Sequence, residues 1–261
     1  MTAPVLKVSA LTKRYGGVQA LDGVSFAIAP GELLALIGPN GAGKSTCFNI
    51  VNGQLRPDSG HVRLIGSGTA GRDITGLAPR RIARLGVGRT FQVATVFGSM
   101  TALENVQMAL IAARGQVFGL WRPARDLARQ EALDLLEQTG MAAQAGRPAA
   151  SLAYGDVKRL ELAMALAGEP RLLLMDEPTA GMSAGERHDM IALVRRLTRV
   201  RGLAVLFTEH SMDVVFGHAD RVVVLARGRL IADGSVEAVR DDPAVREVYL
   251  GGIPVGGRNE R

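Results

Sequence analysis

The chain has 261 residues, of which 47% are hydrophobic, and it carries a formal net charge of +6. This length is enough for one large domain or a domain with a subdomain, and the apolar content is enough for a buried core. No apolar run approaches the ~18 residues that span a bilayer, and residues 1–9 lack the apolar stretch of a signal peptide. The single cysteine excludes an internal disulfide framework and favours a reducing compartment, so we expect a cytoplasmic chain.

The basic charge suits nucleotides, nucleic acid or anionic lipid headgroups. Lysines and arginines are scattered without a block of like charge, so an ordinary solvated surface explains them equally well. Aromatic residues make up only 4% of the chain and do not alternate with basic residues. We therefore predict no nucleic-acid partner.

Strands and helices alternate in the first 92 residues. Apolar and β-branched runs predict strands at residues 6–11, 24–28, 33–37, 61–65 and 87–91. Helices are predicted at residues 44–52 and 79–85. We assign residues 1–92 to the first part of an α/β nucleotide-binding core.

From about residue 93 the strand signals stop. Thr101 and Glu104 have the spacing of a capping box, which predicts a helix to about residue 113. Further helices are predicted at residues 124–139 and 155–167. Residues 93–167 therefore read as a helical subdomain inserted into the α/β fold.

Strand signals return after residue 167. The unbroken apolar run at 172–175 is typical of a strand covered on both faces. The other strands are predicted at 203–208 and, as a pair, within 221–231, and the helices at 184–200, 236–240 and 243–250. We assign residues 168–250 to the second part of the core and 251–261 to a mobile tail.

A glycine-rich segment separates the strand at 33–37 from the helix that follows. It fits the phosphate-binding pattern G-x-x-x-x-G-K-[ST]. Glycines let backbone N–H groups turn inward around a phosphate, and the helix points its positive end at the same anion. Lys44 would reach the β- and γ-phosphates, and the Ser45 hydroxyl would ligate Mg²⁺. The residues expected to bind nucleotide here are Gly38, Asn40, Gly41, Gly43, Lys44, Ser45 and Thr46.

Polar side chains also follow three predicted strands. Asp176 ends the apolar run and is suited to the Mg²⁺ shell, while Glu177 is suited to polarise an attacking water. Taken alone, this pair also fits a simple strand-ending turn. His210 and Gln92 each follow another strand, so they are expected near the γ-phosphate. Gly155 starts a predicted helix whose N-terminus forms a second, weaker phosphate-binding signal.

Together these motifs resemble the ATP-binding subunit of ABC transporters over nearly the whole chain. The resemblance implies a P-loop NTPase core with an antiparallel β subdomain and an inserted α-helical subdomain. It implies an ATPase that uses ATP and Mg²⁺, with Tyr15 stacked on adenine and Gly155 facing the ATP of a partner subunit. The implied catalytic residues are Glu177, His210, Gln92 and Lys44, and the implied Mg²⁺ ligands, partly through water, are Ser45, Gln92 and Asp176.

The chain departs from the family pattern at two places. At the signature segment, Ala153, Tyr154 and Asp156 replace serine, glycine and glutamine. Ser183 stands where the loop after Glu177 usually carries an aspartate. Gly155 and the start of its helix remain as the matching features of the signature.

Finer details resemble the larger ATPase of branched-chain amino-acid importers, notably residues 152–155, 180–182, 114–129 and 242–251. This resemblance implies a peripheral subunit at the cytoplasmic face of the membrane. The implied partners are a second ATPase subunit, different or identical, two membrane permease subunits and, indirectly, a periplasmic solute-binding protein. The alternatives are uptake of urea or amides, a soluble ABC ATPase without a transport role, and a regulator without turnover, which Glu177 and His210 argue against.

Overall fold

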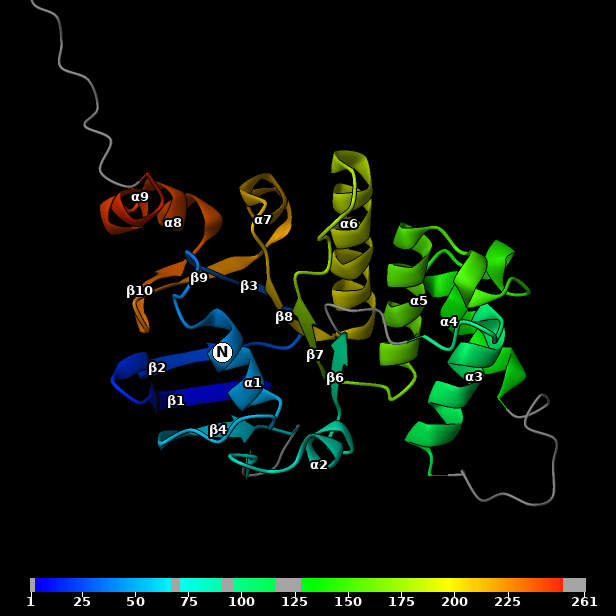
Figure 1. The fold of residues 1–261 in the computed structure, drawn as a ribbon, viewed down its shortest axis with the longest axis horizontal. Coiled ribbons are helices and arrows are strands. Elements are labelled where there is room, and N and C mark those ends of the chain that lie inside the picture. The colour runs from blue at the N-terminus through cyan, green and yellow to red at the C-terminus, as the bar shows by residue number, and fades with distance from the viewer. Residues whose placement is uncertain (1–2, 67–70, 91–95, 116–127, 251–261) are drawn as a thin grey trace, which may run out of the picture.

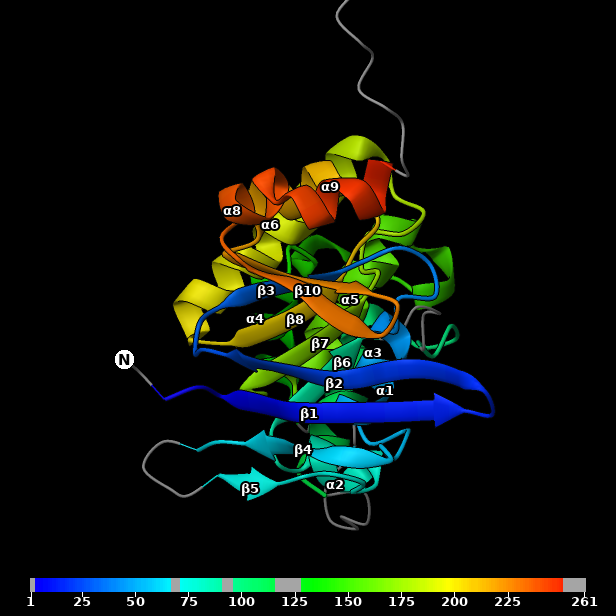
Figure 2. The same cartoon turned by 90° about the vertical axis from the view of Figure 1, so that its left-hand side faces the viewer.

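The computed structural model describes residues 3–66, 71–90, 96–115 and 128–250. Its first sheet is antiparallel, with strand order β2-β1-β4-β5. The bounds are β1 (Leu6–Tyr15), β2 (Val18–Ile28), β4 (Ser59–Leu64) and β5 (Arg72–Asp73). Figure 2 shows these strands side by side across the lower half of the molecule.

The second sheet has strand order β10-β9-β3-β8-β7-β6. Its bounds are β3 (Leu33–Ile37), β6 (Val87–Thr90), β7 (Leu172–Asp176), β8 (Ala204–Thr208), β9 (Arg221–Ala226) and β10 (Arg229–Gly234). Only β10 is antiparallel to its neighbour. The five parallel strands therefore present their carboxyl ends at one edge.

Strand β3 is buried along its whole length, and its two faces belong to different cores. Leu34 and Leu36 pack with the antiparallel sheet and with α1 (Lys44–Val51). Leu33, Ala35 and Ile37 pack on the opposite face, with the helices of the second half of the chain. Burial on both faces explains why this strand reads as an unbroken apolar run rather than an alternating one.

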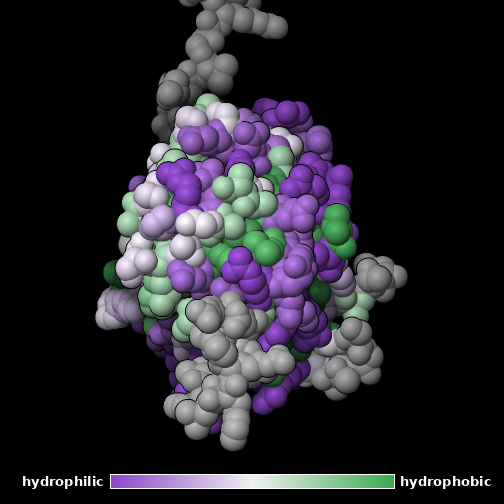
Figure 3. All heavy atoms as spheres, turned by 90° about the vertical axis from the view of Figure 1, so that its right-hand side faces the viewer, coloured by the Kyte–Doolittle hydropathy of each residue, from purple (hydrophilic) through white to green (hydrophobic). Residues whose placement is uncertain are grey.

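The remaining helices are α2 (Pro79–Ala83), α3 (Ala102–Ala113), α4 (Arg129–Gln138), α5 (Tyr154–Leu166), α6 (Ala184–Arg201), α7 (Met212–His218), α8 (Val236–Asp241) and α9 (Pro243–Leu250). Helices α3, α4 and α5 pack together at one end of the molecule, on the right in Figure 1. The visible surface of that end is mostly hydrophilic, with a small apolar area near its centre (Figure 3). In the described ranges, no helix has both the length and the hydropathy to cross a bilayer.

Most predicted elements are confirmed, and the main differences are as follows. The hairpin β1–β2 continues to Tyr15 and Val18, because its outer residues pair directly across the two strands. Strand β5 and helix α7 have no counterpart among the predictions. Ala128 has a left-handed backbone (φ 54°), so α4 begins at Arg129, whereas the sequence predicted residue 124, outside the described residues. The predicted tail at 251–261 also lies outside them.

Candidate functional site

The site lies where β3, β7 and β8 end side by side. Thr208, the last residue of β8, is in register with Leu36 on one neighbour and Asp176 on the other. This register brings the glycine loop, Asp176 and the residues after Thr208 to the same edge of the sheet. Gln92 follows β6, the next strand in the sheet, but lies outside the described residues.

Two glycines of the loop occupy positions where any other residue would displace neighbouring backbone atoms. A Cβ atom at Gly38 would lie 2.2 Å from the Leu225 carbonyl oxygen, and one at Gly43 would lie 2.4 Å from the Ala20 carbonyl oxygen. Gly43 also has a left-handed backbone, with φ 104°. Gly41 has φ 77° but faces open space. The first two glycines are therefore required for packing, while Gly41 leaves room over the loop.

Helix α1 begins without a side-chain cap, because its N-cap residue is Gly43. The N–H groups of its first turn therefore have no side-chain acceptor, and they point toward the loop. Asn40 and Ser45 are exposed on the loop, and Thr46 is half-buried. An uncapped helix N-terminus ringed by glycine N–H groups and hydroxyls fits a phosphate.

Lys44 curls back over the loop that precedes it. Its Nζ atom donates hydrogen bonds to the carbonyl oxygens of Gly38 (2.5 Å) and Pro39 (3.1 Å). Burial lowers the pKa of Lys44 below its ordinary value, and the nearby charges of Glu177 and Asp176 oppose that effect. The ammonium group is thus partly desolvated beside two carboxylates, where an anion would interact with it strongly.

Asp176 is held at the end of β7 by the neighbouring strand. The Thr208 hydroxyl donates to its Oδ1 atom at 2.7 Å, and Arg89 Nη2 lies 3.9 Å from its Oδ2 atom. The described residues contain no cluster of three or more His, Cys, Asp or Glu side chains able to hold a metal. One carboxylate and the Ser45 hydroxyl fit Mg²⁺, which usually completes its shell with water and substrate phosphates.

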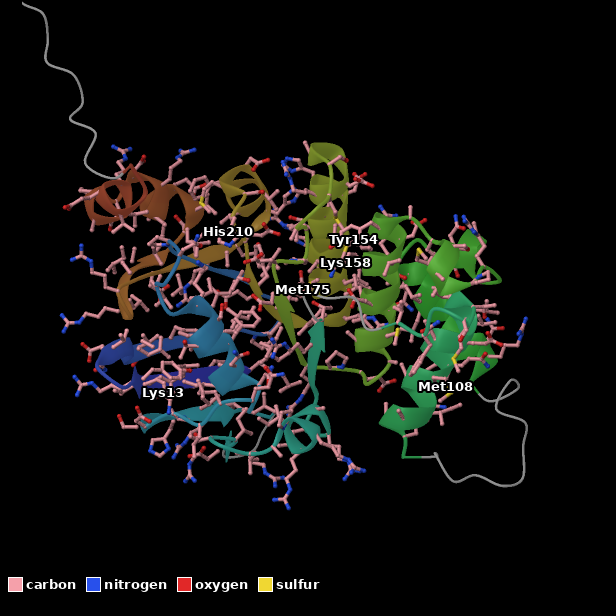
Figure 4. The ribbon with its side chains drawn as sticks, viewed as in Figure 1. Lys13, Met108, Tyr154, Lys158, Met175 and His210 are labelled. Carbon is pink, nitrogen blue, oxygen red and sulfur yellow. The ribbon has the colours of Figure 1, made fainter. Side chains whose placement is uncertain are left out.

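Glu177 and His210 are two titratable groups in direct contact at this edge. Glu177 Oε1 lies 2.8 Å from His210 Nε2. Glu177 has a left-handed backbone (φ 48°), and its N–H donates to the Thr208 hydroxyl at 3.0 Å. His210 and Met175, the residue before Asp176 in β7, are both labelled in Figure 4. A carboxylate held by an imidazole is an arrangement that can accept a proton from water.

The remaining predicted site residues lie elsewhere. Gly155 is in the first turn of α5, and a Cβ atom there would be 3.2 Å from Glu186 Oε1. Helix α5 packs against α3, α4 and β6. Tyr15 ends β1 with its side chain half exposed, and Lys13 Nζ lies 5.8 Å from the centre of its ring.

The sequence interpretation missed a buried polar network beside this site. Glu209 is 4% exposed, and its Oε1 atom accepts hydrogen bonds from Thr179. The signal was present in the sequence, because three polar residues, Thr208, Glu209 and His210, directly follow a buried apolar run. The sequence alone does not show that Thr179 is the hydrogen-bond partner of Glu209.

Comparisons with known proteins agree with this geometry. The family model described as "ABC transporter" matches residues 21–180, and one described as "Branched-chain amino acid ATP-binding cassette transporter" matches residues 229–253. The chain is 40% identical over 258 residues to the high-affinity branched-chain amino acid transport ATP-binding protein BraF of Pseudomonas aeruginosa, covering 96% of this chain and 99% of BraF. It is 38% identical to LivG of Escherichia coli K12, which has the same descriptive name, with the same coverage.

Solved structures give the same result. The ADP conformation of the ATP-binding cassette MJ1267 superimposes with a TM-score of 0.84 at 33% identity, covering 96% of this chain and all of that one. The dimeric cassette MJ0796, bound to ADP and phosphate, gives a TM-score of 0.72 at 26% identity, covering 88% of this chain and 98% of that one. The chain therefore belongs to the ABC transporter family, as one of its nucleotide-binding ATPase cassettes.

Proposed function

We propose that the chain hydrolyses ATP to drive an importer of branched-chain or other hydrophobic amino acids. The observation that best supports hydrolysis is the 2.8 Å contact between Glu177 Oε1 and His210 Nε2, at the same sheet edge as the glycine loop. In this proposal Glu177 accepts a proton from the attacking water, and His210 holds the carboxylate in position. Lys44 and the loop N–H groups neutralise charge that develops on the transferred phosphoryl group.

The residues that would hold Mg²⁺ are Ser45, Asp176 and Gln92, partly through water. When bound, Mg²⁺ neutralises charge on the β- and γ-phosphates. Thr208 supports this role of Asp176, because its hydrogen bond fixes the carboxylate at the strand end. The half-exposed ring of Tyr15, followed by two glycines at which a Cβ would meet nothing within 4 Å, offers an open surface for adenine.

We further propose that two ATPase subunits close head to tail around the nucleotides. Gly155 lies in the first turn of α5, which packs against α3, α4 and β6, so its role as a phosphate contact would be toward the partner's ATP. A dimeric relative of the same fold supports this arrangement. The partner subunit would be a different chain or a second copy of this one.

The solute assignment comes from the relatives. Both BraF and LivG are described as ATP-binding proteins of high-affinity branched-chain amino acid transport. Their similarity extends over nearly the full length of both chains, and residues 229–253 match a family model of the same description. Uptake of urea or amides, or an ABC ATPase without transport, are the alternatives.

A groove supports contact with a membrane permease. It has a volume of about 750 Å³ and lies between α2 and β6 on one side and the carboxyl-terminal halves of α3 and α5 on the other. Ile82, Ala109 and Met164 contribute apolar walls, while Arg80 and Arg84 add positive charge. A short amphipathic helix with an acidic residue fits such a groove. We propose that a permease subunit supplies it, which would place the chain at the cytoplasmic face of the membrane.

Affinity purification from membranes tests this function. The chain is expected to bring down two permease subunits and a second ATPase. In vesicles, ATP hydrolysis by that complex should rise with a solute-binding protein plus leucine, isoleucine or valine. Stimulation by urea or an amide alone would select the first alternative, and hydrolysis without any permease in the complex would select the second.

A further inference from the structure

Three consecutive residues, the last of β8 and the two that follow it, each contact the end of β7 or the segment after it. Thr208 bonds to Asp176 and to the Glu177 N–H, and His210 bonds to the Glu177 side chain. Glu209, between them, bonds to Thr179. The two strand ends are therefore joined by three successive side chains rather than by the Glu177–His210 contact alone.

Glu209 has an unusual environment for a carboxylate. The residue is 4% exposed, and Thr179 is 1% exposed. Its Oε1 atom accepts hydrogen bonds from the Thr179 hydroxyl at 2.5 Å and from the Thr179 N–H at 3.1 Å, while Oε2 accepts one from the His210 N–H at 3.1 Å. Burying a carboxylate is costly unless several donors satisfy it, and these three donors come from only two residues.

The two residues bonded by Glu209 connect it to both members of the Glu177–His210 pair. One is His210 itself, held by its backbone N–H. The other, Thr179, lies two residues beyond Glu177 in a tight turn, in which the Ala180 N–H donates to the Glu177 carbonyl oxygen at 3.1 Å. Glu177 has a left-handed backbone, a conformation that persists only when its surroundings hold it.

We propose that Glu209 is a positioning residue for ATP hydrolysis, and that it sets the place of His210 relative to Glu177 by bonding to His210 and Thr179 together. This inference rests on the proposed ATPase function. Glu209 does not reach the substrate in this proposal. It acts by holding His210 in a fixed place against the segment that carries the general base.

A merely structural role would give a different result. If Glu209 and Thr179 only stabilised the fold, their loss would lower the melting temperature and weaken ATP binding together with turnover. A positioning role predicts a selective fall in kcat, with the dissociation constant for ATP unchanged. It also predicts that the effect depends on His210, because Glu209 acts through that residue.

The decisive variant is Thr179→Val, which keeps the shape of the side chain and removes the hydroxyl donor. Thr179→Ser, which retains the hydroxyl, is its matched control. Both are made in the assembled transporter, in the natural background and in a His210→Ala background, with Glu209→Gln as a second variant if Thr179→Val does not fold. Release of labelled phosphate gives kcat, and calorimetry with the magnesium complex of a non-hydrolysable ATP analogue gives its affinity.

We expect Thr179→Val to lower kcat about tenfold or more, because the free energy of a hydrogen bond to a charged group corresponds to at least about a tenfold change in rate. Thr179→Ser should stay near the natural rate, analogue affinity should not change, and Thr179→Val should have little further effect in the His210→Ala background. An unchanged kcat, a parallel loss of affinity, or the same fold-change in both backgrounds would overturn the inference. An inactive natural transporter, or full activity in Glu177→Gln, would instead overturn the proposed function.

Discussion

His210 Nε2 lies 2.8 Å from Glu177 Oε1, although 33 residues separate the two along the chain. The contact exists because β7 and β8 are adjacent parallel strands with Asp176 opposite Thr208. Glu177 directly follows β7, and His210 lies two residues after the end of β8, so the register of the sheet determines the pairing. The same register sets the position of Asp176 relative to the glycine loop, through β3 on the other side of β8.

The first prediction concerns nucleotide affinity. Lys44→Ala removes an ammonium group whose pKa is lowered by burial and which lies beside two carboxylates. Loss of a charge-assisted contact costs ~1.5–3 kcal/mol, so ATP affinity should fall roughly ten- to a hundredfold. Calorimetric titration measures this, with Lys7→Ala, at an exposed position of β1, as the control. Unchanged affinity in folded Lys44→Ala protein would exclude the assigned role.

The second prediction concerns the glycine loop and stability. Gly43→Ala would place a Cβ atom 2.4 Å from the Ala20 carbonyl oxygen and 2.9 Å from Leu21 Cδ2, at φ 104°. Strain of this kind costs on the order of 1–3 kcal/mol, so the melting temperature should fall and nucleotide affinity with it. Gly146→Ala is the matched control, because a Cβ there meets nothing within 4 Å. Equal melting temperatures for the two variants would contradict the loop geometry.

Local patterns were sufficient to place most of the candidate site residues in the fold. A buried apolar run followed at once by polar residues marked the ends of β7 and β8, so Asp176, Glu177 and His210 could be placed at one edge. The glycine spacing did the same for β3. These predictions depend only on neighbours in sequence and on the rule that parallel strands end together.

What the sequence did not supply are contacts that depend on a particular register or helix packing. The bond from Glu209 to Thr179 requires both strand ends to be known. Helix α7 escaped prediction because it has seven residues, contains Gly217 and has no side-chain cap, so its apolar period is too short to recognise. Strand β5 has only two residues and exists through its pairing with β4.

The third prediction concerns pH and uses a histidine on α7. His218 Nε2 and His188 Nδ1 are 3.0 Å apart. Burial is the main cause that lowers the pKa of His218 below its ordinary value, and the charges of His188 and Arg195 lower it further. The unfolded chain therefore binds the proton more readily than the folded chain, so stability should fall as the pH drops through about 6.5.

The test of this prediction is His218→Asn. Its melting temperature should fall less than that of the natural protein between about pH 7.5 and about pH 5.5. His61→Asn is the control, because the His61 ring contacts a carboxylate, Asp73, rather than a second histidine. A pH dependence that is equally steep in the natural protein and in His218→Asn would contradict the prediction.

The fourth prediction concerns the groove and the permease. Burial raises the pKa of the Cys47 thiol to about 12, so this cysteine should not react with maleimides. A cysteine introduced by Ala112→Cys in the groove should crosslink to a permease subunit in the assembled transporter. Arg229→Cys, exposed on β10, is the control. Crosslinks from Arg229→Cys alone would place the permease against β10 and contradict the proposed contact at the groove.

The fifth prediction concerns the coupling of ATP hydrolysis to solute transport, at a residue next to the groove. Gln92 follows β6, which contributes Val87 and Arg89 to the groove. Gln92→Ala should retain most ATP binding and lose the stimulation of hydrolysis by solute. Gln54→Ala, which also lines the groove, is the control, and stimulation should persist in it. Full stimulation in Gln92→Ala would exclude the coupling role.

The last prediction concerns the general base and the dimer. Glu177→Gln keeps the size of the side chain and its ability to bond to His210, but the amide cannot accept a proton. If Glu177 is the base, turnover should fall by ~10²–10⁴ while ATP binding survives. The γ-phosphate should then persist between two subunits and hold them together. Light scattering should detect a dimer of Glu177→Gln with ATP and Mg²⁺ but not with ADP.

The partner must be controlled for in this experiment, because Ala153 and Ser183 alter the segments that would face it. Glu177→Gln protein is therefore measured alone and with the second ATPase that co-purifies from membranes. Glu169→Gln, in the turn after α5, is the matched control and should hydrolyse ATP at the natural rate without accumulating a dimer. Near-normal hydrolysis by Glu177→Gln would exclude Glu177 as the base. A monomer under both ATP conditions would exclude head-to-tail closure, since the variant would then retain ATP without closing on a partner.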